Sequence, residues 1–393
     1  PRFSHGGTGL RTTDQQPQLG CTRLRRFTGV AAAGLLLFAG QACAKEAPAP
    51  PAVAGADYAV DEGSSALLDS NKRVVISDFV VVFQLDSMVR NDNASKIGNL
   101  TLFGGNTKDV AAKMAWQAPD TALMQNIADT GLAILKADFK AKGIEVLDES
   151  ALSTQPAYAS ILAGGGLKNL DDYNIVNISE AAYNKNSIGD DVSSAAKVVS
   201  ARGLTPYSHS LFEGGRCCAV YKGLPSSKIY YVPGFEIDLA KALDAVVVKA
   251  WIFVDFAKVS AGVNQEGWAG GAGGAVVNYS ANADSTVRIS AQKTRLSFRL
   301  PTSTNKTRNV PKSWAAKDGD LVVALKKPML IGDKYYTVTN TGETGGQQLR
   351  ASLGGTQHLN FGATLHDADA YKADLTKGMD KLLGEVVTIA LGR

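Results

Sequence analysis

A twelve-residue run, RVVISDFVVVFQ at residues 73–84, constrains the fold more than any other stretch of the sequence. Its β-branched residues favour a strand, and only Ser77-Asp78 interrupts its apolar character. A strand that is apolar on both faces needs cover on both, which is typical of sheets in α/β proteins. The run therefore predicts a buried strand at the centre of a layered α/β domain.

The residues that follow predict a β-α-β unit. Asp120 suits the N-cap of a long helix and Gly143 suits its end. Residues 144–147 then indicate a second strand, and a right-handed crossover would place both strands in one sheet. The helix carries an apolar stripe of helical period, made of Leu123, Ile127, Ile134, Ala137 and Ala141 and flanked by Met124 and Leu135.

The second half predicts a helix at 235–243, a long strand at 245–259, and antiparallel strands after it. A change of phase within 286–300 indicates a bulge, and Gly332-Asp333 suits the turn of a hairpin. An amphipathic helix ends the chain, with Leu375, Met379, Leu382, Leu383, Val386 and Val387 on its buried face. The fold class expected is α/β (α+β): a mixed sheet with helices packed on it.

The stretch RLRRFTGVAAAGLLLFAGQACAKEAPAPP, residues 23–51, resembles a secretory signal. Three arginines precede an apolar run of twelve residues, which is shorter than the ~20 residues that a membrane-spanning helix needs, so an uncleaved anchor is disfavoured. Two interpretations stay open. Ala42, Cys43 and Ala44 fit a small-x-small cleavage site before Lys45, and Cys43 also fits a degraded lipidation motif.

We therefore expect a leader at 1–44, whose first residues resemble translated upstream sequence, and a Pro/Ala-rich tether at 45–63. One large α/β domain would span 64–393, with a polar, loop-rich insertion around 164–228 and a β-rich excursion around 262–350. A tether behind an export signal would let the folded body stand off the membrane surface.

Charge argues against a nucleic-acid partner. Residues 1–44 hold five of the 41 basic and one of the 37 acidic side chains, so the rest has 36 of each and no net charge. After the leader, no segment combines clustered Lys and Arg with interleaved aromatic residues, which nucleic-acid binding requires.

The sequence contains no metal or cofactor motif that we would assign, so we expect no cofactor. Cys217 and Cys218 are adjacent and fit no metal-ligand spacing; they are either two half-buried residues or a strained vicinal or intermolecular disulfide. The glycine cluster at 267–274 lacks both the dinucleotide and the phosphate-loop pattern, and indicates a crossing between strands.

Candidate catalytic residues lack their partners. Asp78 and Asp255 each precede a phenylalanine in an apolar run and suggest paired carboxylates, but acids at strand ends commonly cap turns or face solvent. Ser194 and Lys197 match an SxxK pattern without its companion motifs. His366 and the aspartates beside it are explained by a helix N-terminus. We expect a protein that is not an enzyme.

The order of elements resembles the curli secretion lipoprotein (CsgG-like) family and the amino-terminal domain of TolB. The matching residues are Val74–Phe79 for a V-x-x-x-D-F strand, Ile144–Leu152 for a second strand, and Leu239–Val248 for a helix-to-strand passage. The resemblance covers about two thirds of the chain after the leader and carries over no ring or pore, because residues 164–228 have no counterpart. It implies an α/β envelope module without catalysis that acts through protein contacts.

Together these features predict a non-enzymatic cell-envelope protein in assembly, secretion or protein-protein interaction. Its expected location is the periplasm, or the periplasmic face of the outer membrane of a Gram-negative bacterium, with secretion as the alternative. Expected partners are other envelope proteins, further copies of the chain, and the outer membrane through a lipid if Cys43 is modified. The alternative function is a secreted hydrolase or ligand-binding protein whose site leaves no motif.

Overall fold

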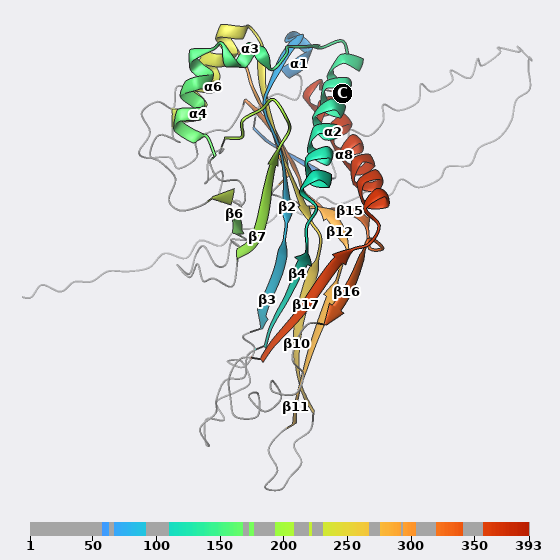
Figure 1. Cartoon of the computed structure of the whole chain (residues 1–393). Coiled ribbons are helices and arrows are strands. Elements are labelled where there is room, and N and C mark those ends of the chain that lie inside the picture. The colour runs from blue at the N-terminus through green and yellow to red at the C-terminus, as the bar shows by residue number, and fades with distance from the viewer. Residues whose placement is uncertain are drawn as a thin grey trace, which may run out of the picture. The chain divides into compact units, whose positions relative to one another are not determined.

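Two parallel strands form the centre of the computed structural model (Figure 1). β2 (Arg73–Gln84) pairs with β9 (Val246–Asp255), from Val74 opposite Val246 to Phe83 opposite Val254. Eleven consecutive residues of β2 and the first nine of β9 are buried. The predicted central strand and its apolar character on both faces are therefore confirmed.

The structure describes residues 57–62, 67–91, 110–167, 173–176, 193–207, 220–221, 231–266, 276–291, 294–303, 320–340 and 357–392. All of these lie in one unit that spans residues 50–393. Among them, no helix combines the length and the apolar content that crossing a membrane would take.

The main sheet is mixed, in the order β1-β14-β13-β9-β2-β7-β6-β8, with β12 beside β9, β15 beside β12, and β5 beside β2. Its remaining strands are β1 (Tyr58–Glu62), β5 (Glu145–Val146), β6 (Tyr173–Val176), β7 (Ser193–Ser200), β8 (Val220–Tyr221), β12 (Val287–Ile289), β13 (Arg295–Arg299), β14 (Leu321–Leu325) and β15 (Met329–Gly332). The second strand of the predicted β-α-β unit, β5, pairs parallel with β2 as expected.

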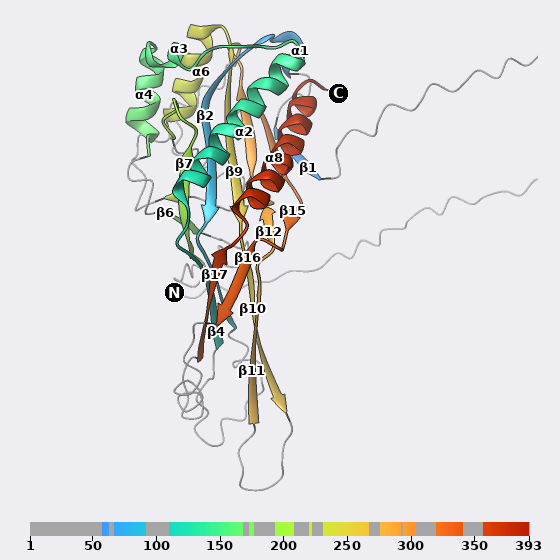
Figure 2. The same ribbon diagram turned by 45° about the vertical axis from the view of Figure 1, so that its right-hand side comes forward.

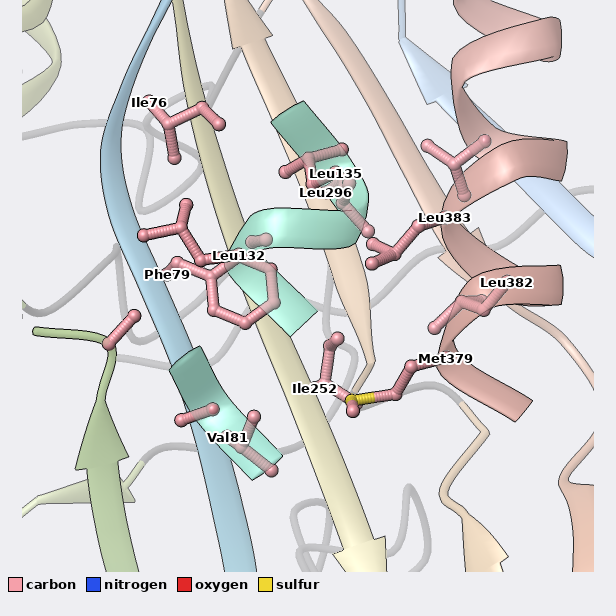
Figure 3. Close-up of a cluster of buried hydrophobic side chains, with 14 of the residues drawn as sticks. Ile76, Phe79, Val81, Leu132, Leu135, Ile252, Leu296, Met379, Leu382 and Leu383 are labelled. Carbon is pink, nitrogen blue, oxygen red and sulfur yellow. The ribbon is translucent and has the colours of Figure 1, made fainter. Parts of the chain in front are cut away.

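Two long helices, α2 (Thr121–Ala141) and α8 (Ala368–Ala390), pack together on one face of this sheet (Figure 2). Asp120 caps α2 by accepting from the amides of Ala122 and Leu123, and Asp367 caps α8 by accepting from Ala370. All six residues predicted for the buried face of α8 are buried. Between helices and sheet lies a large apolar core (Figure 3).

The buried stripe of α2 is rotated from the predicted one. Ala137 and Ala141 are exposed, whereas Gly131, Leu132 and Phe139 are buried, so the prediction was wrong for those two alanines. The reason is the close packing of Gly131, where an added Cβ would come within 2.8 Å of the Phe79 ring. An alanine side chain buries little apolar area, so the larger side chains around it determine which face of the helix is buried.

Three shorter helices lie on the other side of the sheet: α3 (Ser150–Ser153), α4 (Pro156–Gly165) and α6 (Val232–Leu243) (Figure 1). α4 packs against α6, and α6 contacts β9 and β13. The sheet residues on this side include a small apolar cluster of Val80, Val82, Ala196, Val198, Trp251 and Phe253. A further helix, α1 (Leu67–Ser70), precedes β2.

A smaller sheet has the order β16-β17-β4-β3, formed by β3 (Asp86–Asn91), β4 (Val110–Gln117), β16 (Tyr336–Asn340) and β17 (Gln357–Leu365). A hairpin of β10 (Lys258–Glu266) and β11 (Val276–Asp284) contacts β3 and β4. An aromatic cluster of Trp116, Phe256, Tyr336 and Tyr371 joins the smaller sheet to β9 and α8, with ring centroids 5.3–6.0 Å apart. The chain is thus a mixed α/β protein.

Two strand predictions need correction, and the structure adds a strand that the sequence did not predict. Gly332-Asp333 does not close a hairpin, because β15 pairs with β12 whereas β16 pairs with β17. The run 286–300 is two strands that both pair with β9, rather than one bulged strand. The range 164–228, expected to be loop-rich, contains β7, which pairs with β2 inside the main sheet. Short strands whose partners are distant in sequence leave little local signal.

Candidate functional site

A β-bulge in β2 places two polar residues side by side under α6. The register with β9 passes from Ile76 opposite Val248 directly to Asp78 opposite Lys249, so Ser77 is the extra residue. Before the bulge Ile76 lies on the α2/α8 side, and after it Phe79 and Val81 do (Figure 3). The extra residue therefore keeps the apolar face continuous and leaves Asp78 on the opposite face.

The carboxyl group of Asp78 is completely buried. Its Oδ2 accepts hydrogen bonds from Trp251 Nε1 at 2.9 Å and from the Tyr207 amide at 3.4 Å. Burial raises the pKa of Asp78 to about 8, although the bond from Trp251, the charge of Lys249 and the Tyr207 amide all oppose the rise. The raised pKa favours the protonated form of Asp78 at neutral pH.

Three further charged residues meet beside Asp78. Lys249 Nζ lies 2.8 Å from Glu236 Oε1, and Arg299 Nη2 lies 3.5 Å from Glu236 Oε2. The three side chains are 5%, 0% and 2% exposed for Lys249, Glu236 and Arg299. Charged side chains are almost never buried this deeply unless they are paired, so the pairing is what permits α6 to lie on the sheet.

Asp320 completes the balance of charge. Its Oδ1 lies 3.9 Å from Arg299 Nη1, and its Oδ2 accepts from the Leu300 amide at 2.6 Å. With Asp78 protonated, the two cations Lys249 and Arg299 are matched by the two anions Glu236 and Asp320. We call these five residues, Asp78, Glu236, Lys249, Arg299 and Asp320, the ionic cluster.

Tyr207 and Ser77 close the cluster from the side of α4. The hydroxyl groups of the two residues are 2.7 Å apart, and Lys249 Nζ lies 5.4 Å from the centre of the Tyr207 ring. Burial raises the pKa of Tyr207 well above its usual value, and the nearby Glu236 and Asp78 raise it further, so the phenol stays neutral. The cluster is thus sealed by a neutral ring and a hydroxyl.

The chemistry open to this arrangement is limited by its closure. Four of the five residues in the ionic cluster are nearly inaccessible, and a general acid or base must come within hydrogen-bonding reach of its substrate. In this closed form the cluster joins α6 to β2, β9 and β13 and fixes their relative register. It is therefore a structural site.

The residues predicted from sequence are mostly not brought together. Asp78 pairs in register with Lys249, six residues before Asp255 along β9, which separates the two aspartates by about 20 Å of strand. The expectation that Asp78 caps a turn or faces solvent was wrong, because it lies buried within β2. Ser194 and Lys197 lie in the extended strand β7.

His366 precedes the N-cap of α8, as its helix-terminal interpretation predicted, and its Nδ1 lies 3.2 Å from Thr337 Oγ1. In the part of the chain that the structure describes, no three His, Cys, Asp or Glu residues gather as metal ligands would. Ala42, Cys43, Ala44, Cys217, Cys218 and the glycine cluster at 267–274 lie outside the described residues.

Sequence reasoning missed Glu236, Lys249 and Arg299. A signal was present in two of them, because Lys249 interrupts the run VVVKAWIFV and Arg299 the run LSFRL. A lone charge inside an apolar strand requires a buried partner of opposite sign. Nothing local identified Glu236 as that partner.

Comparison of the chain with protein-family models, with curated proteins and with solved structures finds no match.

Proposed function

We propose that the chain is an exported cell-envelope protein, held near the membrane by its amino-terminal segment, that acts in assembly or secretion through protein contacts. The observation that carries the proposal is the segment at 23–51, in which arginines, a twelve-residue apolar run, Cys43 and a Pro/Ala-rich stretch follow one another. The CsgG-like and TolB-like resemblance belongs to the same proposal.

The fold is compatible with this role in one respect. The most deeply buried acidic and basic side chains among the described residues, Asp78, Glu236, Lys249 and Arg299, hold α6 on the sheet and are closed to substrates. A protein that works through its surface needs a rigid body and no solvent-open catalytic cluster. A secreted hydrolase or ligand-binding protein is the competing hypothesis.

Metabolic lipid labelling of the wild type against Cys43→Ser, followed by membrane fractionation and in-cell cross-linking, tests the proposal. We expect label and membrane association in the wild type, loss of both in Cys43→Ser, and cross-links to envelope proteins or to further copies of the chain. A cleaved, label-free, membrane-associated protein with such cross-links favours the cleavage interpretation. Protein found in the cytoplasm with its leader intact, or a soluble monomer without cross-links, would overturn it.

A further inference from the structure

The place where the amino-terminal segment joins the fold is built from the turn between β14 and β15. The Lys326 amide donates to the carbonyl of Asp57 at 2.7 Å, and Lys327 Nζ lies 3.1 Å from Asp57 Oδ1. β1 then runs antiparallel to β14, with Tyr58 opposite Leu325. The point of attachment and the turn are therefore one surface.

This surface combines two lysines with the most exposed large apolar side chain of the described residues. Leu330 is 69% exposed, and Lys326, Lys327 and Pro328 are exposed as well. We call Lys326, Lys327, Pro328 and Leu330 the junction patch. The side chains of Lys327 and Asp57 are 69% and 60% exposed, so their ion pair holds the ammonium group of Lys327 only weakly.

The junction patch is rigidly mounted. Leu330 pairs in register with Arg288 of β12, and the neighbouring Ile331 lies against Gly378 of α8, where an added Cβ would come within 2.4 Å of it. Tyr58 of β1 donates to Glu385 of the same helix. An exposed leucine held on a fixed strand cannot turn inward to hide, so its exposure is a lasting property of the surface.

A single exposed leucine is ordinary on a protein surface, but its position here adds two arguments. The fourteen residues from Ala44 to Asp57 can span at most about 50 Å at ~3.5 Å per residue, so lipidation at Cys43 would hold Asp57 near the bilayer. The two lysines also match the negative charge of anionic headgroups, at about 1 kcal/mol for each lysine near the surface, and Leu330 supplies apolar area that can enter the interface.

We propose that the junction patch docks on an anionic lipid surface, with Lys326 and Lys327 at the headgroups and Leu330 inserted between them. The proposal rests on the proposed function, because export and tethering are what bring this surface to a membrane. Contact at both Cys43 and the junction patch would fix the orientation of the body relative to the bilayer, which one flexible tether alone would not do.

The test uses the full chain carrying Cys43→Ser, so that no lipid is attached and the leader is the same in every sample. Binding to vesicles of phosphatidylethanolamine and phosphatidylglycerol at 3:1 is compared with binding to phosphatidylcholine vesicles by sedimentation. Lys326→Gln/Lys327→Gln should weaken binding to the anionic vesicles roughly 25-fold, at about fivefold per lysine. The matched control is Lys140→Gln/Lys142→Gln, which changes the same charge at exposed positions at the end of α2 and should have less than about a twofold effect.

Hydrogen exchange of the unsubstituted patch on the same vesicles gives a second readout that needs no variant. Residues 326–332 should gain protection on the anionic vesicles, and residues 140–143 should not. Leu330→Ser should weaken binding several-fold without changing the preference for anionic lipid. Equal losses in the junction and control variants, or no added protection at 326–332, would overturn the proposal. Lipid labelling plays no part in these measurements, so the proposal and the lipoprotein assignment can fail separately.

Discussion

The two faces of β2 and β9 solve the same burial problem with different chemistry. Toward α2 and α8 the strands present Phe79, Val81 and Ile252, which pack against apolar side chains of the two helices (Figure 3). Toward α6 the same strands present Asp78 and Lys249 beside Val80 and Trp251. Apolar packing is non-directional, whereas the ionic cluster requires one position of α6 on the sheet and one protonation state of its ionisable groups. The apolar face therefore stabilises the fold through many interchangeable contacts, whereas the α6 face stabilises it only while every member of the ionic cluster is present.

The largest effect is expected from removing one member of the ionic cluster. Lys249→Met should destabilise the fold by about 3–5 kcal/mol, because it leaves Glu236 as a buried charge with a poorer partner. Urea denaturation measures the loss. The control is Lys113→Met, which breaks the more exposed ion pair with Asp86 and should cost less than about 1 kcal/mol. Equal losses would show that burial does not distinguish the two pairs.

The apolar face should respond strongly but without dependence on pH. Leu135→Ala removes a fully buried side chain between α2 and the sheet and should cost about 2–5 kcal/mol. We expect the same loss at pH 5 and pH 8, because the substitution removes no ionisable group, and Asp138, whose pKa is raised by burial and by the charge of Asp380, is present in both the wild type and the variant. Denaturation at the two pH values checks this. A loss that changes between them would show that the two faces are coupled.

Asp78 should make the α6 face sensitive to pH. Its folded pKa of about 8 lies above the ordinary value of 3.8 for an aspartate, so the folded state binds the extra proton between these pH values. Stability should therefore fall as pH rises through that window, by up to ~1.4 kcal/mol per pH unit from this group. Asp78→Asn, which stays neutral, should flatten the decline. Between pH 5 and pH 7 the stability of the variant relative to the wild type should therefore rise by about 2–3 kcal/mol.

Denaturation midpoints across pH 5–8 measure this effect, and Asp333→Asn at an exposed position serves as the control. The control should leave the slope unchanged. If Asp78→Asn also leaves it unchanged, the carboxyl group of Asp78 is ionised in the folded protein, and the balance of charge in the ionic cluster must be redrawn.

The smallest effect is expected at the helix caps of the apolar face. Asp120→Ala removes the carboxylate that accepts from the Ala122 and Leu123 amides and should cost about 1 kcal/mol. Asp367→Ala should cost a similar amount at α8. Thermal unfolding measures both. A loss as large as that of Leu135→Ala would mean that the caps, rather than the packing, hold these helices on the sheet.

The apolar face was largely predictable from the sequence. The run 73–84, the cap Asp120 and the stripe of α8 are local patterns with one physical reading each, and the structure contains all three. The ionic cluster was not predictable, because its members come from β2, α6, β9, β13 and Asp320, and the pairing of their charges exists only after the strands have assembled. Asp78 was predicted to cap a turn or to face solvent, because the bulge that buries it depends on the register with β9.

The position of β1 at the edge of the main sheet decides how the molecule bears mechanical force. A pull on the chain ahead of Asp57 is carried first by the contacts of Asp57 with Lys326 and Lys327, and then by the contacts of Tyr58 with Leu325 and Glu385. The force is then shared between β14 and the C-terminal helix α8. The central strands β2 and β9 would bear this force only after the contacts of β1 with β14 and α8 had broken.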